Sequence, residues 1–270
     1  MRIPRSWEAP HQIGPHGSFR FFGRASNGKY QLDVDALRSA FRQGPELASR
    51  MKSFRVDRLA KIISNTGPAK LPSGSKVVVH LIPIQSFSAQ TAIDLTAVRR
   101  NPNLLKSTLQ SGGQTRVNLD GYLASTYRSS EGDKGYAQLF RDGALEVVEF
   151  VDRWEVHGYN FLPGKYFDEL VQKIIGGAQR IYQALGIDAP LVAMLTLLEM
   201  QDRLMGAGKS YGYERDLPFG QPQILCPDVL VDTLSNTPET IAFPVVNLGW
   251  NAAGYEQSIF YDKNGNWIGK

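Results

Sequence analysis

The segment from Tyr136 to Phe150 constrains the fold more than any other part of the chain. Two runs rich in apolar and β-branched residues flank an Asp142-Gly143 pair, which is the pattern of an antiparallel hairpin with a tight turn. A strand around Gly121–Tyr127 would extend the hairpin to a meander. The segment Gly164–Leu185 predicts a helix that Gly186 ends. Together these elements predict an α+β fold, a mixed sheet with flanking helices.

Further elements are predicted on both sides of this segment. Residues 1–17 are predicted to form a loop, because prolines and glycines interrupt them, and Asn27-Gly28 predicts a turn. The predicted strands are Phe19–Arg24, Lys76–Ile82, Ala189–Met200 and Gln223–Val231, with an Asn-Gly hairpin within Tyr261–Trp267. The predicted helices are Val34–Arg42 with Asp33 as its N-cap, Pro45–Ser64, and a short helix with a loop within Ile93–Leu109.

Two of these predictions depend on single residues. Gly44-Pro45 is expected to separate the first two helices, because proline inside a helix removes a hydrogen bond. In the second helix Arg58 shares a face with Leu47, Met51, Phe54 and Ile62. We expect its stem to pack on apolar neighbours while its charged head reaches solvent.

The segment Pro68–Gly74 is rich in proline, glycine and serine and predicts a domain boundary. The chain would then comprise a domain over residues 1–68 and a mixed α/β domain over residues 69–270, the latter with a central sheet and two or three helices. Hydrophobic residues make up 42% and charged residues 21% of the chain, which indicates globular domains rather than disorder.

The charge is unevenly distributed along the chain. Residues 1–70 hold 13 lysines and arginines against 5 acidic residues, whereas the remaining 200 residues hold 17 against 21. Such asymmetry favours a polyanion-binding N-terminal part and an acidic body, and an ordinary solvated surface is the alternative.

The motifs that invite a catalytic interpretation are incomplete. Met205–Ser210 resembles a phosphate-binding loop, but Arg203 stands where that motif needs its first glycine. Asp262–Trp267 resembles the opening of a calcium loop, but Trp267 stands at the glycine position, so a hairpin turn is favoured.

Single candidate residues also favour structural roles. The four histidines lack metal-ligand spacing, and His80 is expected to be a core residue inside a strand. Glu146, Glu149 and Asp152 are expected to face water, and Cys226 to be a small buried residue. We therefore predict no complete catalytic site, no metal and no cofactor.

Basic and aromatic residues alternate near the N-terminus. In a strand, Arg20, Phe22 and Arg24 would lie on one face and Phe19 and Phe21 on the other. Cations on such a face can neutralise phosphates while an aromatic ring stacks on a base. A sheet edge protected by charge is the alternative. The predicted nucleic-acid-binding residues are Arg5, Trp7, Arg20, Phe22, Arg24, Lys29, Arg50 and Arg55.

A resemblance to a known family lies in Ile3–His11, Phe21–Arg24, Gly28–Tyr30 and Asp33–Phe41. These segments resemble the closing half of the AlbA_2 (Schlafen-like) DNA-binding domain. More weakly, Phe54–Ile62, Val79–Pro83, Gly249–Tyr255 and Asn264–Trp267 resemble the rest of proteins that carry this domain. The resemblance implies DNA binding. The family's acidic strand–helix–strand portion would precede Met1, so the resemblance transfers no catalytic residue and implies a fragment that pairs with a separate N-terminal polypeptide or forms a homo-oligomer.

The predicted function is therefore nucleic-acid binding without sequence specificity, with DNA favoured over RNA. The alternative is a protein-interaction or ligand-sensing regulatory module, such as a defence-system component, in which residues 69–270 do the work. Neither a signal peptide nor an apolar run of membrane-spanning length is present in the sequence. This predicts a cytoplasmic protein without a membrane partner.

Overall fold

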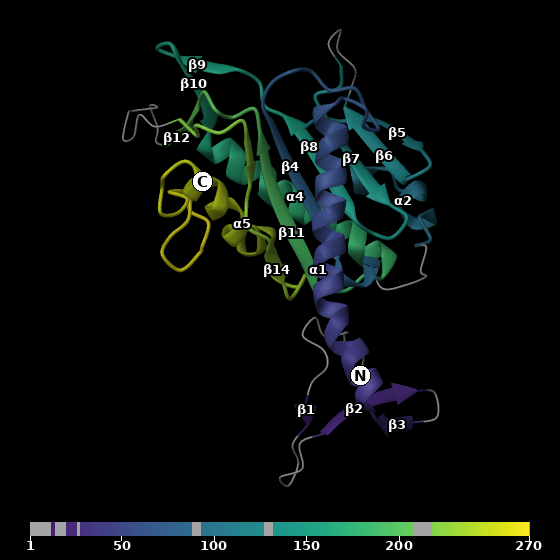
Figure 1. Ribbon diagram of the computed structural model, residues 1–270. Helices are drawn as coiled ribbons and strands as arrows, with labels where there is room; N and C mark the ends of the chain where they lie inside the picture. The colour runs from purple at the N-terminus through teal and green to yellow at the C-terminus, as the bar shows by residue number, and fades with distance from the viewer. Residues whose placement is uncertain are drawn as a thin grey trace. The chain divides into compact units, whose positions relative to one another are not determined.

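The computed structural model describes residues 12–13, 20–25, 28–87, 93–126, 132–207 and 218–269 (Figure 1). The chain divides into two compact units, Met1–Ala60 and Lys61–Lys270. Strands and helices occur in both units, and the fold is α+β as predicted. The division falls near the end of a helix, eight residues before the position 68 at which the sequence predicts a boundary.

The N-terminal unit contains a three-stranded antiparallel sheet followed by a long helix. Its strands are β1 (Gln12–Ile13), β2 (Arg20–Ala25) and β3 (Gly28–Gln31), in the order β1-β2-β3. The predicted strand over Phe19–Arg24 is confirmed as β2. The prediction of loop throughout residues 1–17 is wrong at β1, where Gln12 pairs with Phe21, because backbone pairing to a neighbouring strand fixes even a two-residue segment.

Helix α1 (Val34–Ile63) is continuous through Pro45. The prediction of two separate helices is therefore wrong. Proline removes one helical hydrogen bond and restricts the residue before it mainly through that residue's Cβ. Here the preceding residue is Gly44, which has no Cβ, so α1 can continue. Asp33 does stand at the start of the helix, since its carbonyl accepts the first helical bond from the Leu37 amide at 2.9 Å.

The second unit is built on an eight-stranded sheet (Figure 1). Its order is β13-β11-β4-β8-β7-β6-β5, with β14 also paired to β11, and every pairing is antiparallel. The strands are β4 (Lys76–Pro83), β5 (Gly113–Val117), β6 (Gly121–Thr126), β7 (Gly135–Phe140), β8 (Leu145–Phe150), β11 (Leu191–Leu198), β13 (Gln223–Leu225) and β14 (Val229–Val231). The predicted hairpin is confirmed as β7–β8, and the meander continues through β6 to β5.

A second, smaller sheet is mixed. It has the order β12-β10-β9, with β10 antiparallel to β9 and parallel to β12. Its strands are β9 (Trp154–Val156), β10 (Tyr159–Pro163) and β12 (Arg203–Gly206).

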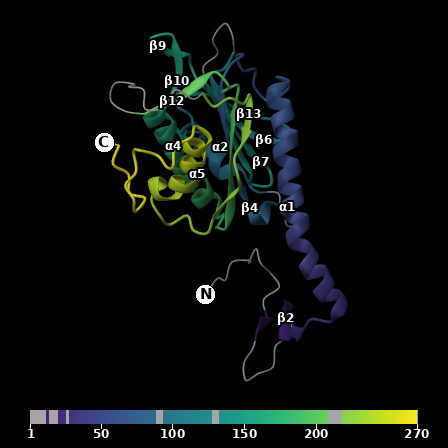
Figure 2. The same cartoon turned by 60° about the vertical axis from the view of Figure 1, so that its left-hand side comes forward.

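The helices of the second unit are α2 (Thr96–Arg100), α3 (Asn103–Lys106), α4 (Gly164–Leu185) and α5 (Pro238–Ala252), with a short 3-10 helix η2 at Ile84–Phe87. The predicted helix α4 is confirmed, and Gly186 ends it in the left-handed conformation at φ 64°. Figure 2 shows α4 and α5 together on one side of the large sheet.

The core lies between this side of the sheet and α4. Alternate residues of the central strands are buried there, such as Val77, Val79 and Leu81 on β4, and they meet Val171 and Ile174 of α4. Every residue of β4 and of β11 is buried, which confirms that the nearly continuous apolar run at Lys76–Ile82 forms a buried strand.

Candidate nucleic-acid interface

The candidate interface begins with the hairpin of β2 and β3 in the N-terminal unit. The two strands pair in antiparallel register, with Phe22 opposite Gln31 and Arg24 opposite Lys29. Aromatic residues favour strands, and pairing with β1 on the other side of β2 completes the small sheet. Cross-strand partners share one face of a sheet. Positions 22, 24, 29 and 31 therefore belong to the same face of the hairpin.

A cation–π contact identifies this face. The Nζ atom of Lys29 lies 5.5 Å from the centroid of the Phe22 ring, within the distance at which an ammonium is attracted to a ring face. Lys29 is diagonal to Phe22 in the register, and a long side chain can bridge that separation. Lys29 is exposed and Phe22 is half-buried. A positive charge and an aromatic plane thus lie side by side on the surface of this unit.

The remaining predicted residues contribute unequally. Arg5 and Trp7 lie outside the described residues, and Arg20 and Arg24 are placed on β2 by their backbone alone. Arg50 is exposed on α1, whereas Arg55 is only 6% exposed. A buried guanidinium cannot reach a phosphate in solvent, so Arg55 has no part in the interface proposed below. Phe22 and Lys29 are the two predicted side chains that the structure brings together.

Arg58 also departs from expectation. It is 4% exposed, so its head is buried together with its stem, and the prediction that it reaches solvent is wrong. Met51, Leu59 and Ile62 are buried as well. Residues three and four apart share a helix face, which places Arg58 in the middle of this buried stripe.

The acids of β8 were predicted to face water, and this is wrong for two of them. Glu146 and Glu149 are 0% and 2% exposed, because β8 lies between β4 and β7 in the middle of the large sheet. Asp152, beyond the end of β8, has a 65% exposed side chain and pairs with Lys134 at 2.7 Å. Of these three acids, Asp152, which lies beyond the end of β8, is the one that faces solvent.

Glu146 joins a buried hydrogen-bonded group. One carboxylate oxygen lies 2.9 Å from Nε2 of His80, and the other accepts a bond from the Tyr136 hydroxyl at 2.9 Å. All three residues are 0% exposed, and His80 is a core residue as predicted. These two bonds give the buried carboxylate, imidazole and hydroxyl hydrogen-bond partners, which polar groups in the interior require. Cys226, at 4% exposed, is also buried as predicted.

Two other buried acids have perturbed protonation. Burial raises the pKa of Glu149 to about 7, although the Gln110 amide donates to its Oε1 at 2.7 Å and favours the charged form. Burial likewise raises the pKa of Asp168 to about 7, against bonds from Ser258 and Trp250 that lower it. Asp168 is 0% exposed. Both groups lie in the interior rather than line an open site: Glu149 joins β8 to Gln110, and Asp168 joins α4 to Trp250 of α5 and to Ser258.

The motif-like segments have structural roles where they are described. Asp262 Oδ1 accepts bonds from the Asn264 and Asn266 amides at 2.8 Å, which is a turn, and Tyr261 pairs with Trp267 across it. The end of the phosphate-loop-like segment, residues 208–210, lies outside the described residues. Within the described ranges, no three His, Cys, Asp or Glu side chains are grouped as metal ligands would be. No described helix has the length and hydropathy that crossing a membrane requires.

Comparison with known proteins adds no family to these observations: no family model, curated protein or solved structure matches the chain. The resemblance to the AlbA_2 domain therefore stays a prediction, and the functional argument depends on the geometry of the chain itself.

Proposed function

We propose that the N-terminal unit binds nucleic acid through the β2–β3 hairpin, by contacting phosphates and stacking on bases without reading sequence. The observation that carries this proposal is the Lys29 ammonium 5.5 Å from the Phe22 ring, with Arg24 as the register partner of Lys29. Cations adjacent to an aromatic face are what sequence-tolerant binding of single strands uses.

The chemistry of the contact follows from this pair. A phosphate attracts the Lys29 ammonium, and the ring face that the ammonium covers then becomes open to a base. Arg20 and Arg24 on β2 supply further cations along the same strand, and Arg50 adds one from α1. Every base has a π-face, so stacking on Phe22 tolerates any sequence. DNA is the favoured ligand, and RNA is the comparison that tests this preference.

The experiment is fluorescence anisotropy of the whole chain with labelled 20-nucleotide single-stranded DNA, the corresponding duplex and RNA, over a series of salt concentrations. Each phosphate contact contributes about 0.7 to the slope of log affinity against log salt for single strands, and about 0.9 for duplex DNA. Lys29→Glu should therefore lower the slope by about 1 and weaken binding to all sequences alike.

The matched control is Lys263→Glu, which makes the same charge change at an exposed residue of the other unit. It should leave affinity and slope near those of the parent. Phe22→Ala should weaken single-strand binding by roughly 1–3 kcal/mol while keeping the salt slope, and Phe22→Tyr should retain binding. If Lys29→Glu behaves like Lys263→Glu, the hairpin is not the interface, and Lys29 only protects the edge strand β3 from pairing.

A further inference from the structure

The large sheet of the second unit has two edges, which differ in how they are protected. One edge is formed by β13 and β14, which are three residues long, with Pro222 before them and Pro227 between them. Short edge strands and prolines, which lack an amide donor, resist the addition of a further strand. At the other edge, β5 is five residues long and contains neither proline nor lysine. Within the described residues, β5 pairs with β6 alone.

The register of β5 shows which of its backbone groups point outward. The Asn118 amide donates to the Gly121 carbonyl at 3.0 Å where β5 and β6 join. Bonded and non-bonded pairs alternate along an antiparallel ladder. Positions 114 and 116 therefore bond to β6, whereas positions 113, 115 and 117 direct their amides and carbonyls away from it. The outer edge of β5 thus presents a row of backbone donors and acceptors.

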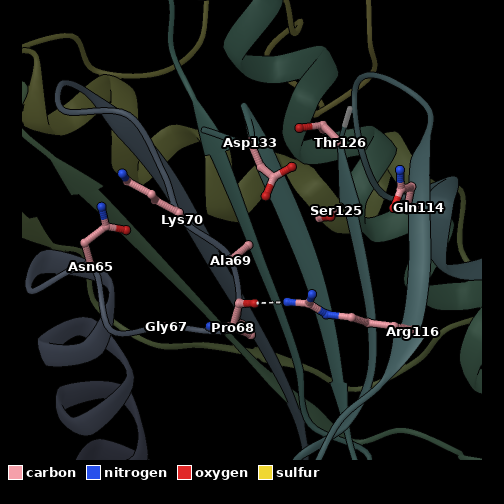
Figure 3. A pocket seen from close by; sticks show the side chains of 10 residues that line it. All are labelled: Asn65, Gly67, Pro68, Ala69, Lys70, Gln114, Arg116, Ser125, Thr126 and Asp133. Atoms are coloured by element: carbon pink, nitrogen blue, oxygen red, sulfur yellow. Dashed lines mark hydrogen bonds between the residues drawn. The ribbon is translucent and has the colours of Figure 1, made fainter. Parts of the chain in front are cut away.

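The charge on β5 does not shield this edge. Arg116 Nη2 donates to the Pro68 carbonyl at 2.7 Å. Figure 3 shows the Arg116 side chain extending over the face of the sheet toward Pro68, across a pocket that both residues line. A charge held there is not directed at a strand that approaches the outer edge. Val117 is 50% exposed and Leu119, in the turn after β5, is 95% exposed, so an added strand would also cover apolar surface.

We propose that β5 pairs antiparallel with β5 of a second copy of this chain, about a two-fold axis at Thr115. This register opposes Thr115 to its own equivalent and Val117 to Gly113 of the second copy, and each opposed pair exchanges both N–H···O bonds. It also places Arg116 opposite Gln114 of the second copy, so like charges are not directly opposed. A two-fold axis at Arg116 would oppose two arginines, and one at Gln114 would leave Val117 without an opposed residue in β5.

The self-complementarity of β5 favours a second copy over another protein as the partner. In a two-fold interface the same surface serves both copies, and the outward groups of β5 match themselves in this register. The interface contains five residues of β5 from each copy, against roughly 20–30 a side in a standard interface. We therefore expect a weak dimer that dissociates at micromolar concentrations. The inference does not depend on nucleic-acid binding by the N-terminal unit.

Sedimentation velocity of the whole chain from about 1 to 500 µM measures this association. We expect the weight-average mass to rise with concentration from that of the monomer toward that of the dimer. Thr115→Pro removes one outward amide from each copy and leaves the bonds to β6, because an edge strand tolerates proline where its amide faces solvent. The dissociation constant of the dimer should rise at least about ten-fold.

A second variant tests the same edge by charge. Val117→Lys should also raise the dissociation constant at least about ten-fold, because a lysine on an edge strand opposes pairing. The matched control is Leu225→Lys, which makes the same kind of change at a 45% exposed residue of β13, on the other edge. It should change the dissociation constant less than about two-fold. Circular dichroism and melting at the lowest concentration check the folding of each variant.

Cysteine variants test the register. Residues of a non-hydrogen-bonded pair have Cα atoms about 4.5 Å apart, which a disulfide can span. A mixture of Gln114→Cys and Arg116→Cys chains should therefore form a mixed disulfide dimer under mild oxidation. Either variant alone should form much less, because its two cysteines lie on a diagonal, roughly 7–8 Å apart. The parent chain, in which Cys226 is buried, gives the background.

Three results would overturn the proposal. A chain that stays monomeric over the whole concentration range would leave the β5 edge to a strand of another protein. A dimer that Thr115→Pro and Val117→Lys leave intact, or that Leu225→Lys weakens equally, would place the interface elsewhere. A mixture of the two cysteine variants that cross-links no better than each variant alone would contradict the register.

Discussion

Asp168 offers a direct test of how burial controls ionisation in this protein. Its carboxylate lies between α4, where it originates, and two hydrogen-bond donors. The Trp250 indole donates to Oδ1 at 2.8 Å and the Ser258 hydroxyl donates to Oδ2. Burial raises the pKa of this group from its ordinary value of 3.8 to about 7. The folded protein therefore holds a proton that the unfolded chain releases.

The sign and the size of the effect on stability follow from that difference. Because the folded protein binds the Asp168 proton more tightly than the unfolded chain does, protonation favours the folded state. This contribution to the free energy of unfolding is complete below pH 3.8 and is lost as the pH rises through 7. At 1.36 kcal/mol for each pKa unit, the whole loss is roughly 4 kcal/mol. The part lost between pH 5 and pH 8 is roughly 3 kcal/mol, because the decline is already under way at pH 5.

Asp168→Asn removes the titration with little change of shape. The amide oxygen can accept from Trp250, and the amide nitrogen can donate to the Ser258 hydroxyl oxygen, which already accepts from the Phe260 amide at 3.1 Å. Urea unfolding of parent and variant, followed by tryptophan fluorescence from pH 5 to pH 8, gives the free energies. Between pH 5 and pH 8 the free energy of unfolding of the variant should rise by roughly 3 kcal/mol relative to that of the parent.

Glu149 titrates in the same range, but it is common to both proteins and cancels in the difference. A difference that stays constant within about 1 kcal/mol would refute the reasoning. It would mean that the bonds from Ser258 and Trp250 hold Asp168 ionised despite its burial.

Three further predictions concern stability and are checked by urea unfolding, with circular dichroism to verify the fold. Arg203→Lys should lower the free energy of unfolding by roughly 2–4 kcal/mol. The buried guanidinium donates to the Ser75 hydroxyl and to three backbone carbonyls, and an ammonium has too few donors in the right directions to bond all four. An unchanged urea midpoint of unfolding would contradict this. Gly177→Ala should cost about 1–3 kcal/mol despite the better helix propensity of alanine, because its Cβ would lie 2.5 Å from Thr108 Cγ2, and a stabilised variant would show that α4 can move away. Gly186→Ala has open space around the new Cβ but keeps φ at 64°, so it should cost only about 1–2 kcal/mol; a larger loss would mean that contacts rather than backbone strain decide there.

The elements predicted correctly are those whose signals are local. The turn at Asp142-Gly143 specifies β7 and β8, with Gly143 at φ 93°, and the helix α4 ends at its glycine. Helix α5 was missed, although Thr237 and Pro238 mark its start and the Thr237 side chain accepts from the Thr240 amide at 3.3 Å. Pro244 lies inside α5, as Pro45 lies inside α1, where it led to the prediction of a break that the structure does not have. In α1 the helix continues because Gly44, the residue before Pro45, has no Cβ.

The polar groups were harder to predict than the elements. The strand bearing Phe22 and the turn after it were predicted, but β3 was not, and the contact of Lys29 with Phe22 needed the register of β2 and β3. The partners of Asp168 lie 82 and 90 residues away from it. No spacing rule connects residues so far apart in the chain.

The position of β4 in the sheet has a consequence during synthesis on the ribosome. β4 lies between β8 and β11, so its second neighbour is translated long after it, roughly 5–20 s later at ordinary elongation rates. Until then the apolar strand has one open edge, and such an edge in a nascent chain is prone to aggregate. Early folding of the local meander from β5 to β8 would protect the other edge of β4. We therefore expect chains that end before Leu191 to associate with chaperones or form inclusion bodies, whereas chains that include β11 can close the sheet.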